Sequence, residues 1–187
     1  MRKIIYWVHT SVDGYVDGPA GEFDWPLMGP ELSAYSMEVH DRVDTFLYGR
    51  AVWEMMSGYW PTAESFSSDP HDLRFAPIWR STPKIVASRT LTGPLGWNTR
   101  VIGDDLAGHL AALKAEPGKD LLLNGGSALA GSLAEAGLLD EVQVIVHPVV
   151  LGGGKPLLPI GTDRIDLELV ETRTFDSRAV LLRYTRP

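Results

Sequence analysis

Apolar residues alternate along the chain between short continuous runs, typical of buried strands, and positions three or four apart, typical of helices. The runs predict strands over Lys3–His9, Thr45–Tyr48, Lys84–Ser88, Thr99–Ile102, Asp120–Leu123 and Glu141–Val150. The helical spacing predicts helices over Glu31–Val43, Ala51–Ser57, Leu106–Ala115 and Ser127–Ala136. Two further alternating segments predict antiparallel strands over Leu167–Thr174 and Ala179–Thr185.

Three segments between these elements are rich in turn-forming residues. A glycine-rich loop follows the first strand and reaches about Pro30, and Gly152-Gly153-Gly154 follows the long apolar run. Residues 59–82 contain many Ser, Pro and Asp with one aromatic cluster around Phe75 and Trp79, which predicts a surface excursion carrying one short helix.

Strands that alternate with helices up to residue 150, followed by a terminal hairpin, predict an α/β fold. The expected sheet is mostly parallel, with helices on both faces and an antiparallel C-terminal edge. A length of 187 residues favours a single domain over 1–187. In such sheets ligands bind outside the carboxyl ends of the strands, which directs attention to the loops after His9, Tyr48, Ser88 and Asn124.

Composition narrows the classes of function. Lys and Arg number 17 against 24 Asp and Glu, and the net charge of −7 argues against a general nucleic-acid or membrane-surface binder. The chain has no cysteine, and its histidines have no metal-ligand spacing, so no metal site is predicted. No apolar run approaches the length of a membrane span, and the expectation is a cytoplasmic protein.

Three of the loops that follow predicted strands carry groups that can bind an anion. Gly125-Gly126-Ser127 leads from a strand into a helix, where unpaired N–H groups and the helix dipole favour phosphate. The alternative there is a tight turn with Ser127 as the helix cap. Gly49-Arg50 opens another helix, and Ser88-Arg89-Thr90 closes a third strand with two hydroxyls and a guanidinium. Each could be an ordinary turn, but three such exits in one parallel sheet favour a phosphate-bearing ligand.

These residues carry a family resemblance. The segments SVDGYVDG, YGRAVWE, PKIVASRTL and NGGSALAGSLAEAGLLDEVQVIVHPVVLGGGKPL, in this order and spacing, resemble the dihydrofolate reductase superfamily. Within it, the sequence is most similar to the C-terminal reductase domain of the deaminase-reductase of bacterial riboflavin biosynthesis. The resemblance implies a three-layer αβα fold, NADPH as cofactor, hydride transfer to a heterocyclic or imine-like substrate, and a homodimer.

The same resemblance assigns roles to individual residues. It places Gly49 and Arg50 on the cofactor phosphates and Ser88 and Arg89 on the adenosine 2′-phosphate. Gly125, Gly126 and Ser127 fall in the pyrophosphate loop. Val8 and His9 fall where backbone groups face the nicotinamide amide, and a catalytic role for the His9 side chain is a lesser alternative. Asp13, with Gly14, belongs to the loop that covers the nicotinamide and is a candidate catalytic residue.

The sequence departs from the family pattern at two points. Val52 stands where the family commonly has a threonine that contacts phosphate. The carboxylate that protonates the pterin in dihydrofolate reductases falls between Pro30 and Ser33 by family spacing, and Glu31 is the only nearby carboxylate. Glu31 is therefore the candidate proton donor, although a first-turn position on the helix dipole accounts for it equally well.

The preferred hypothesis is an NADPH-dependent reductase that resembles 5-amino-6-(5-phosphoribosylamino)uracil reductase. It would act on a pyrimidine or pterin-like small molecule, mainly by holding the nicotinamide near the acceptor carbon in a dry pocket. One alternative is a weak dihydrofolate or pteridine reductase, whose activity the change Glu31→Gln should abolish. The other is a protein that binds NADPH without turnover.

Overall fold

The computed structural model describes residues 1–161 and 163–187. Their strands are β1 (Ile4–Thr10), β2 (Val43–Gly49), β3 (Lys84–Ala87), β4 (Thr99–Ile102), β5 (Asp120–Asn124), β6 (Glu141–Val146), β7 (Glu168–Thr174) and β8 (Val180–Thr185). They form one sheet in the order β4-β3-β2-β5-β1-β6-β8-β7. The first six strands of the chain pair in parallel, and β8 and β7 add the antiparallel edge.

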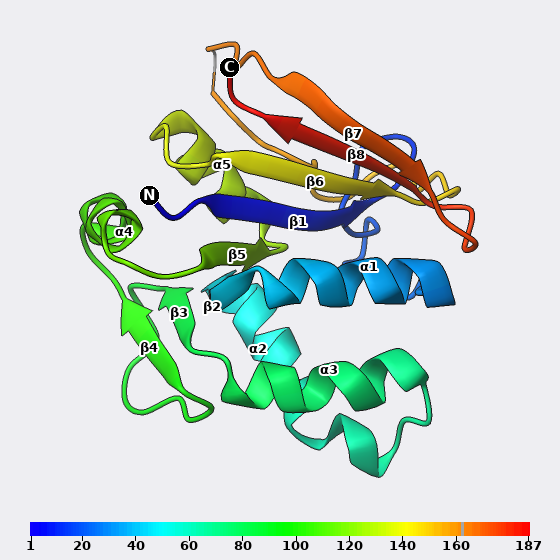
Figure 1. Cartoon of the computed structure of the whole chain (residues 1–187), viewed down its shortest axis with the longest axis horizontal. Coiled ribbons are helices and arrows are strands. Elements are labelled where there is room, and N and C mark those ends of the chain that lie inside the picture. Colours follow the sequence, from blue (N-terminus) through cyan, green and yellow to red (C-terminus); the bar gives the residue numbers. More distant parts are fainter. Residues whose placement is uncertain (162) are drawn as a thin grey trace.

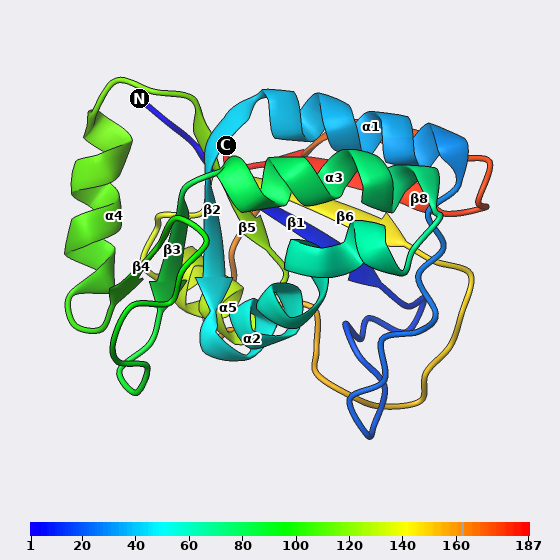
Figure 2. The same ribbon diagram turned by 90° about the horizontal axis from the view of Figure 1, so that it is seen from below.

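Helices cover both faces of this sheet (Figures 1 and 2). They are α1 (Pro30–Asp41), α2 (Arg50–Tyr59), a 3-10 helix (Trp60–Ser65), α3 (Pro70–Ser81), α4 (Leu106–Ala115) and α5 (Ser127–Glu135). On one face the core contains residues of α1, α2 and α3, and on the other it contains residues of α4 and α5. The predicted three-layer αβα architecture with a mostly parallel sheet is therefore confirmed.

The alternation of side chains along β1 divides its residues between the two cores. Trp7 belongs to the core under α1, whereas Tyr6 and Val8 belong to the core under α5. Because β1 lies between β5 and β6 at the centre of the sheet, it is buried on both faces. His9, two residues beyond Trp7, is consequently directed to the α1 side near the carboxyl end of the strand.

The predicted elements were wrong in detail for two segments of the chain. The strand predicted over Glu141–Val150 ends at Val146, since Pro148 lacks the N–H that a further ladder bond needs. Residues 59–82 are not mainly a surface excursion, because they contain a 3-10 helix and the twelve-residue helix α3. Helix α3 buries Phe75, Ala76 and Trp79 against the sheet.

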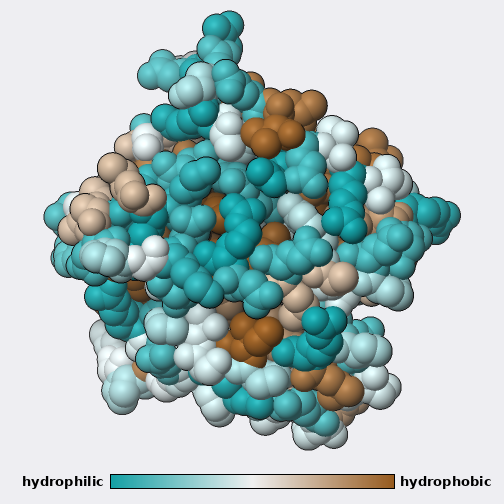
Figure 3. Space-filling model, in the orientation of Figure 1, coloured by the Kyte–Doolittle hydropathy of each residue, from teal (hydrophilic) through white to brown (hydrophobic). Residues whose placement is uncertain are grey.

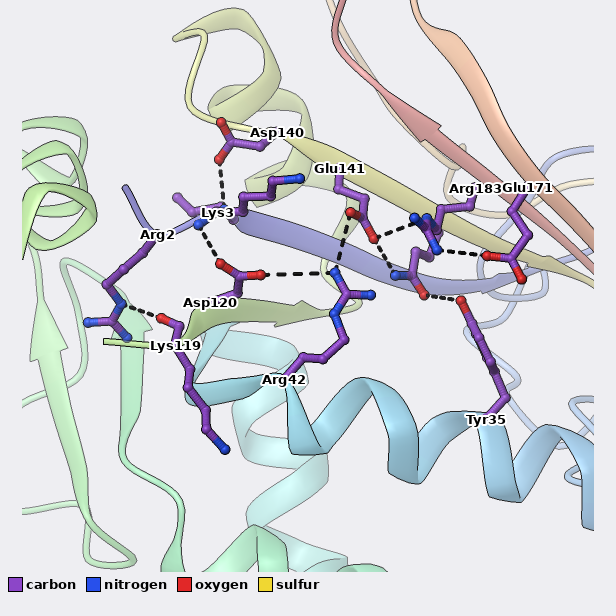
Figure 4. A network of polar contacts seen from close by, with 12 residues as sticks. Arg2, Lys3, Tyr35, Arg42, Lys119, Asp120, Asp140, Glu141, Glu171 and Arg183 are labelled. Carbon is purple, nitrogen blue, oxygen red and sulfur yellow. Dashed lines mark hydrogen bonds and ion pairs between the residues drawn. The ribbon is translucent and has the colours of Figure 1, made fainter. Parts of the chain in front are cut away.

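A network of ion pairs fastens the antiparallel edge at the amino end of β6 (Figure 4). The buried carboxylate of Glu141 lies 3.6 Å from a guanidinium nitrogen of Arg42, just after α1, and 3.6 Å from one of Arg183 on β8. Arg183 also pairs with Glu171 on β7 at 2.7 Å. These contacts join β6, β7 and β8 to the end of α1, at the amino end of the parallel strand β6. The network is therefore structural. The place for a ligand is at the other end of the parallel strands, where their carboxyl ends lie.

One face of the molecular surface is shown by residue hydropathy in Figure 3. The face drawn in Figure 3 is mainly hydrophilic, and its apolar residues lie in separate small spots. Within the described residues, none of the helices has the length and hydropathy to cross a membrane.

Candidate functional site

Two helices begin side by side at the carboxyl edge of the sheet. Helix α2 starts at Arg50 directly after β2, and α5 starts at Ser127 directly after the turn that follows the neighbouring strand β5. Their cap residues are Gly49 and Gly126, and neither helix has a side chain that caps its first N–H groups. A Cβ added to Gly126 would lie 3.7 Å from the backbone nitrogen of Gly49. Two positive helix ends therefore converge on one point.

The Gly125-Gly126 turn has a backbone conformation that favours glycine. Both residues are left-handed, with φ of +66° and +79°. The N–H of Gly125 donates to the carbonyl of Trp7 on β1 at 3.0 Å, which fixes the turn to the centre of the sheet. The interpretation of Ser127 as the helix cap is wrong, since Gly126 occupies that position and Ser127 is the first helical residue.

A cluster of polar side chains lies beside these helix ends. Arg50 Nη1 donates to the hydroxyl of Thr90 at 3.3 Å, and the hydroxyl of Ser88 lies 3.4 Å from that of Thr90. Ser88 Oγ also accepts the N–H groups of Thr90 and Leu91, which sets the turn after β3. Arg89 is 83% exposed and 3.8 Å from Asp104, so its guanidinium is free to move toward a ligand. The structure thus brings Arg50 and Ser88 together and leaves Arg89 at the rim.

Val8 and His9 lie near the carboxyl end of β1, and their side chains differ in direction. Val8 is buried in the core under α5, so only its backbone can contribute to a site. The ring of His9 instead faces a second histidine, His147, which follows β6: His9 Nδ1 lies 2.8 Å from His147 Nε2. On its other side, His147 Nδ1 accepts the N–H of Leu27 at 3.4 Å.

Aromatic residues of the loop after β1 close over this histidine pair. The ring of Phe23 lies 6.4 Å from that of His9, the ring of Trp25 lies 5.6 Å from that of His147, and Phe23 and Trp25 are 5.6 Å apart. The two imidazole rings, 5.0 Å apart, complete a closed set of four. Figure 2 shows this loop, in blue, beyond the end of β1. We call these four residues the imidazole-aromatic cluster.

Asp13 holds two loops together. Its carboxylate accepts the N–H groups of Leu151 and Gly152 at 3.1 and 2.8 Å. Hydrogen bonds, the strongest from the Ser11 hydroxyl and others from these backbone groups, lower its pKa. An ionised carboxylate engaged in this way is suited to positioning the loop of residues 11–18 against the glycines after β6. Its catalytic role stays a prediction.

Glu31 is directed to the turn between β7 and β8. Its carboxylate accepts the N–H of Asp176 at 3.0 Å, and Asp176 in return accepts the N–H of Glu31 at 3.3 Å. Ser33, the other position indicated by family spacing, is buried and lies 2.9 Å from Nδ1 of His71 on α3. The Glu31 carboxylate is thus engaged at the β7-β8 turn, and its role as proton donor stays a prediction.

Sequence reasoning missed His147, His71, Phe23 and Trp25 as parts of this site. His147 is 138 positions from its partner His9 in the sequence, and no local spacing relates the two. The only available signal was the strand register. If β1 and β6 are adjacent and parallel, His9 pairs with Ile145, two positions before His147.

Three histidines, His40 and His147 buried and His9 half-buried, predict a pH-dependent stability. Burial, with charge repulsion from His147 and His71, lowers the pKa of His9 to about 3. Burial also lowers the pKa of His147 and His40 to about 4. An unfolded histidine has a pKa of about 6.5, so below that pH the unfolded chain binds more protons than the folded one. The stabilisation is therefore complete above about pH 6.5 and is lost as the pH falls toward 4.

This loss can be measured by urea unfolding at about pH 7 and about pH 5. The free energy of unfolding should be lower at the acidic pH, and the change His40→Gln should make the decrease smaller. His109→Gln, at an exposed position of α4, is the matched control and should leave the decrease unchanged. Equal decreases in the wild type and in His40→Gln would show that His40 does not contribute to it.

Comparison with known proteins places this fold in a known class. A dihydrofolate reductase from Enterococcus faecalis matches with a TM-score of 0.61 and 14% identity, over 98% of this chain and 96% of that one. A protein of Shewanella sp. PV-4, whose name provisionally assigns it to riboflavin biosynthesis, matches with a TM-score of 0.76 and 23% identity. The match covers 100% of this chain and 99% of that one. The fold is thus that of the dihydrofolate reductase class.

The particular family follows from the sequence. The family model of the RibD C-terminal domain matches residues 2–181, and the chain belongs to this family. Uncharacterized protein YyaP of Bacillus subtilis (strain 168) is 35% identical over 186 residues, which are 98% of this chain and 94% of the relative. The resemblance inferred from the sequence motifs is therefore confirmed.

Proposed function

We propose that this protein is an NADPH-dependent reductase that transfers a hydride to a small heterocyclic or imine-like substrate. Its activity would resemble that of 5-amino-6-(5-phosphoribosylamino)uracil reductases. The observation that carries the proposal is the convergence of the two uncapped helix ends at Gly49 and Gly126 beside the Arg50, Ser88 and Thr90 side chains. Membership of the RibD C-terminal domain family supports it.

The residues at this edge fit the anionic groups of NADPH. A Cβ at Gly125 would meet Val52 at 3.9 Å, so glycine leaves open a space that a side chain would occupy. The free N–H groups at the starts of α2 and α5 suit a pyrophosphate. Arg50 and the rim residue Arg89 suit further phosphate oxygens, including a 2′-phosphate. The missing threonine hydroxyl at Val52 is offset by backbone N–H groups.

When bound, NADPH supplies a hydride from its nicotinamide ring. The protein would contribute by positioning the cofactor and the substrate and by excluding water from the site, and not by supplying a nucleophile. The backbone at Val8 and His9 would orient the nicotinamide amide. The Asp13 anchor and the aromatic loop would hold residues 11–29 over the site and exclude water.

The proposal is tested by titrating the purified protein with NADPH and, separately, with NADH while following tryptophan emission. Six Trp residues make the binding visible. We expect saturable binding with a preference for NADPH, followed by cofactor oxidation when reducible heterocycles are added. Absence of binding by both cofactors would refute the reductase assignment. Binding without oxidation across the substrate panel would favour the alternative of a non-catalytic NADPH-binding protein.

Removing a phosphate-binding guanidinium should weaken NADPH binding. We expect Arg50→Ala and Arg89→Ala each to cost about 1.5 to 3 kcal/mol of affinity, the range for a charge-assisted hydrogen bond. Arg164→Ala is the matched control, because this arginine is 85% exposed and pairs with Asp166. Isothermal titration with NADPH measures all three variants. Unchanged affinity in both test variants would remove the assigned phosphate contacts.

Dihydrofolate or pteridine reduction is a weaker candidate on this geometry. It needs a proton donor at the substrate, and the Glu31 carboxylate instead holds the Asp176 turn. If such activity is detected, its loss in Glu31→Gln would identify Glu31 as the donor. Full retention would exclude that role.

Assembly and location follow from the resemblance. We infer a homodimer in the cytoplasm. The edge strand β7 exposes the apolar side chains of Leu169 and Val170, which are 56% and 48% exposed. A sheet edge of this kind is a natural place for contact between two copies.

A further inference from the structure

Hydrogen bonding fixes the positions of the protons in the His9-His147 pair. The backbone N–H of Leu27 can only donate, so Nδ1 of His147 must be the acceptor in that bond. A neutral His147 then carries its proton on Nε2, 2.8 Å from Nδ1 of His9, and donates it there. His9 must accept at Nδ1, which leaves its own proton on Nε2. A chain of two bonds thus selects one tautomer for each ring.

The Nε2–H of His9 is left without a protein partner. Among the described residues, the hydrogen bond of the His9 side chain is the one at Nδ1, and none is made at Nε2. In the described part of the chain, the fully buried side-chain nitrogen and oxygen atoms without a hydrogen-bond partner are His40 Nε2, Ser177 Oγ and Arg183 Nε. His9 Nε2 does not belong to them, and the half-buried His9 side chain therefore leaves this atom partly accessible. A donor that is fixed in place, solvent-accessible and unused is available for a ligand.

The His9 imidazole lies between aromatic rings, and its surroundings keep it neutral. Trp7 and Phe23 place their rings 5.9 and 6.4 Å from that of His9, both edge-on. The titratable groups that influence His9 are His147 and His71, and both disfavour a positive charge on it. No carboxylate among the described residues stabilises a protonated His9. The ring therefore acts as a neutral N–H donor between aromatic walls, and not as a cation.

We propose that His9 determines substrate specificity: its Nε2–H binds a planar ring that presents a hydrogen-bond acceptor, a carbonyl oxygen or an imine nitrogen, at that point. The inference rests on the proposed function, since Gly125 of the proposed cofactor turn is hydrogen-bonded to Trp7, two residues before His9 on β1. A ring that presents C–H or N–H there would leave the donor unpaired or oppose it to another donor. His147 is a positioning residue, because it acts by selecting the tautomer of His9.

The proton positions can be tested on the wild-type protein without any ligand. Long-range ¹H–¹⁵N spectra of the imidazole rings at about pH 7 distinguish the two neutral tautomers and the cation. We expect His9 and His147 both to be neutral with the proton on Nε2. A proton on Nδ1 of His9, or an imidazolium at this pH, would overturn the proposal.

The ligand class can be tested with two planar bicycles of the same shape, quinoxaline and naphthalene. Quinoxaline has imine nitrogens that accept a hydrogen bond, whereas naphthalene has C–H groups in their place. We expect quinoxaline to bind about tenfold more tightly in NMR titrations of the wild-type protein, the effect of one hydrogen bond. The difference should vanish in His9→Phe, which keeps a ring but has no donor, and persist in His109→Phe on the exposed face of α4.

Equal affinities in the wild type, no binding of quinoxaline, or a preference that survives in His9→Phe would each refute the proposal. The wild-type comparison needs no variant, so misfolding of His9→Phe would not leave the question open. The titrations are run with and without NADPH. Failure of the cofactor to bind contradicts the proposed reductase, whereas loss of the quinoxaline preference with intact NADPH binding contradicts only the role of His9.

Discussion

Replacing Gly126 by valine is expected to abolish NADPH binding while the protein stays folded. At φ of +79° a β-branched residue is strained by about 1 to 2 kcal/mol, which a protein of this size tolerates. The added Cβ would lie 3.7 Å from the Gly49 nitrogen and from Val52, with the rest of the side chain filling the space between the two helix ends. Blocking at least two hydrogen bonds from backbone N–H groups to the NADPH phosphates should weaken NADPH binding by about a hundredfold or more.

Gly137→Val is the matched control for this change. Gly137 follows the other end of α5 and has a similar φ of +71°, so the valine imposes the same kind of backbone strain away from the site. Titration with NADPH, together with urea unfolding, separates the two effects. Both variants should lose similar stability, and only Gly126→Val should lose affinity. Normal affinity in Gly126→Val would show that the phosphates lie elsewhere.

The sequence predicted the glycine turn well because its signal is local. Gly125-Gly126 follows an apolar run after the single residue Asn124 and directly precedes a helical pattern, so the strand, the turn and the helix start are all visible within a dozen residues. The same holds for Gly49-Arg50. Because parallel strands bring such exits to one edge, local patterns were sufficient to collect the anion-binding candidates.

The imidazole-aromatic cluster could not be predicted in this way. Its four members come from β1, the loop after it and the residue after β6, and their contacts depend on how a loop without regular structure folds. A side chain's hydrogen-bond partners depend equally on tertiary packing. Glu31 illustrates this, because its first-turn position was recognised but its contact with Asp176, 145 residues away, was not.

The sequence predicted only a short surface helix within residues 59–82, and it underestimated the length and burial of helix α3 for a different reason. Helix α3 begins with Pro70 and contains Pro77, and a proline inside a helix removes one hydrogen bond and usually indicates a break. Polar residues dominate the surrounding sequence, so its apolar side is narrow. Tertiary packing overrides these signals, since Phe75 and Trp79 of α3 enter the core below β2.

Trp79→Ala is therefore expected to be strongly destabilising, although the sequence pattern placed this residue in a surface excursion. The ring of Trp79 is fully buried, and its Nε1 donates to the hydroxyl of Tyr48 at 3.1 Å. It also lies 4.2 Å below the ammonium of buried Lys84, whose pKa burial lowers to about 8. Truncation leaves a large cavity and removes the aromatic partner of that ammonium. We expect a loss of about 4 to 5 kcal/mol in the free energy of unfolding.

Urea unfolding of the variant measures this loss, with Leu73→Ala as the control. Leu73 belongs to the same helix but is 44% exposed, so its truncation should cost less than about 1 kcal/mol. A cost for Trp79→Ala close to that of Leu73→Ala would mean that α3 contributes little to the core and that residues 59–82 behave as the surface excursion suggested by their composition. A cost several times larger would establish α3 as part of the layer that supports β2, the strand leading into Gly49 and Arg50.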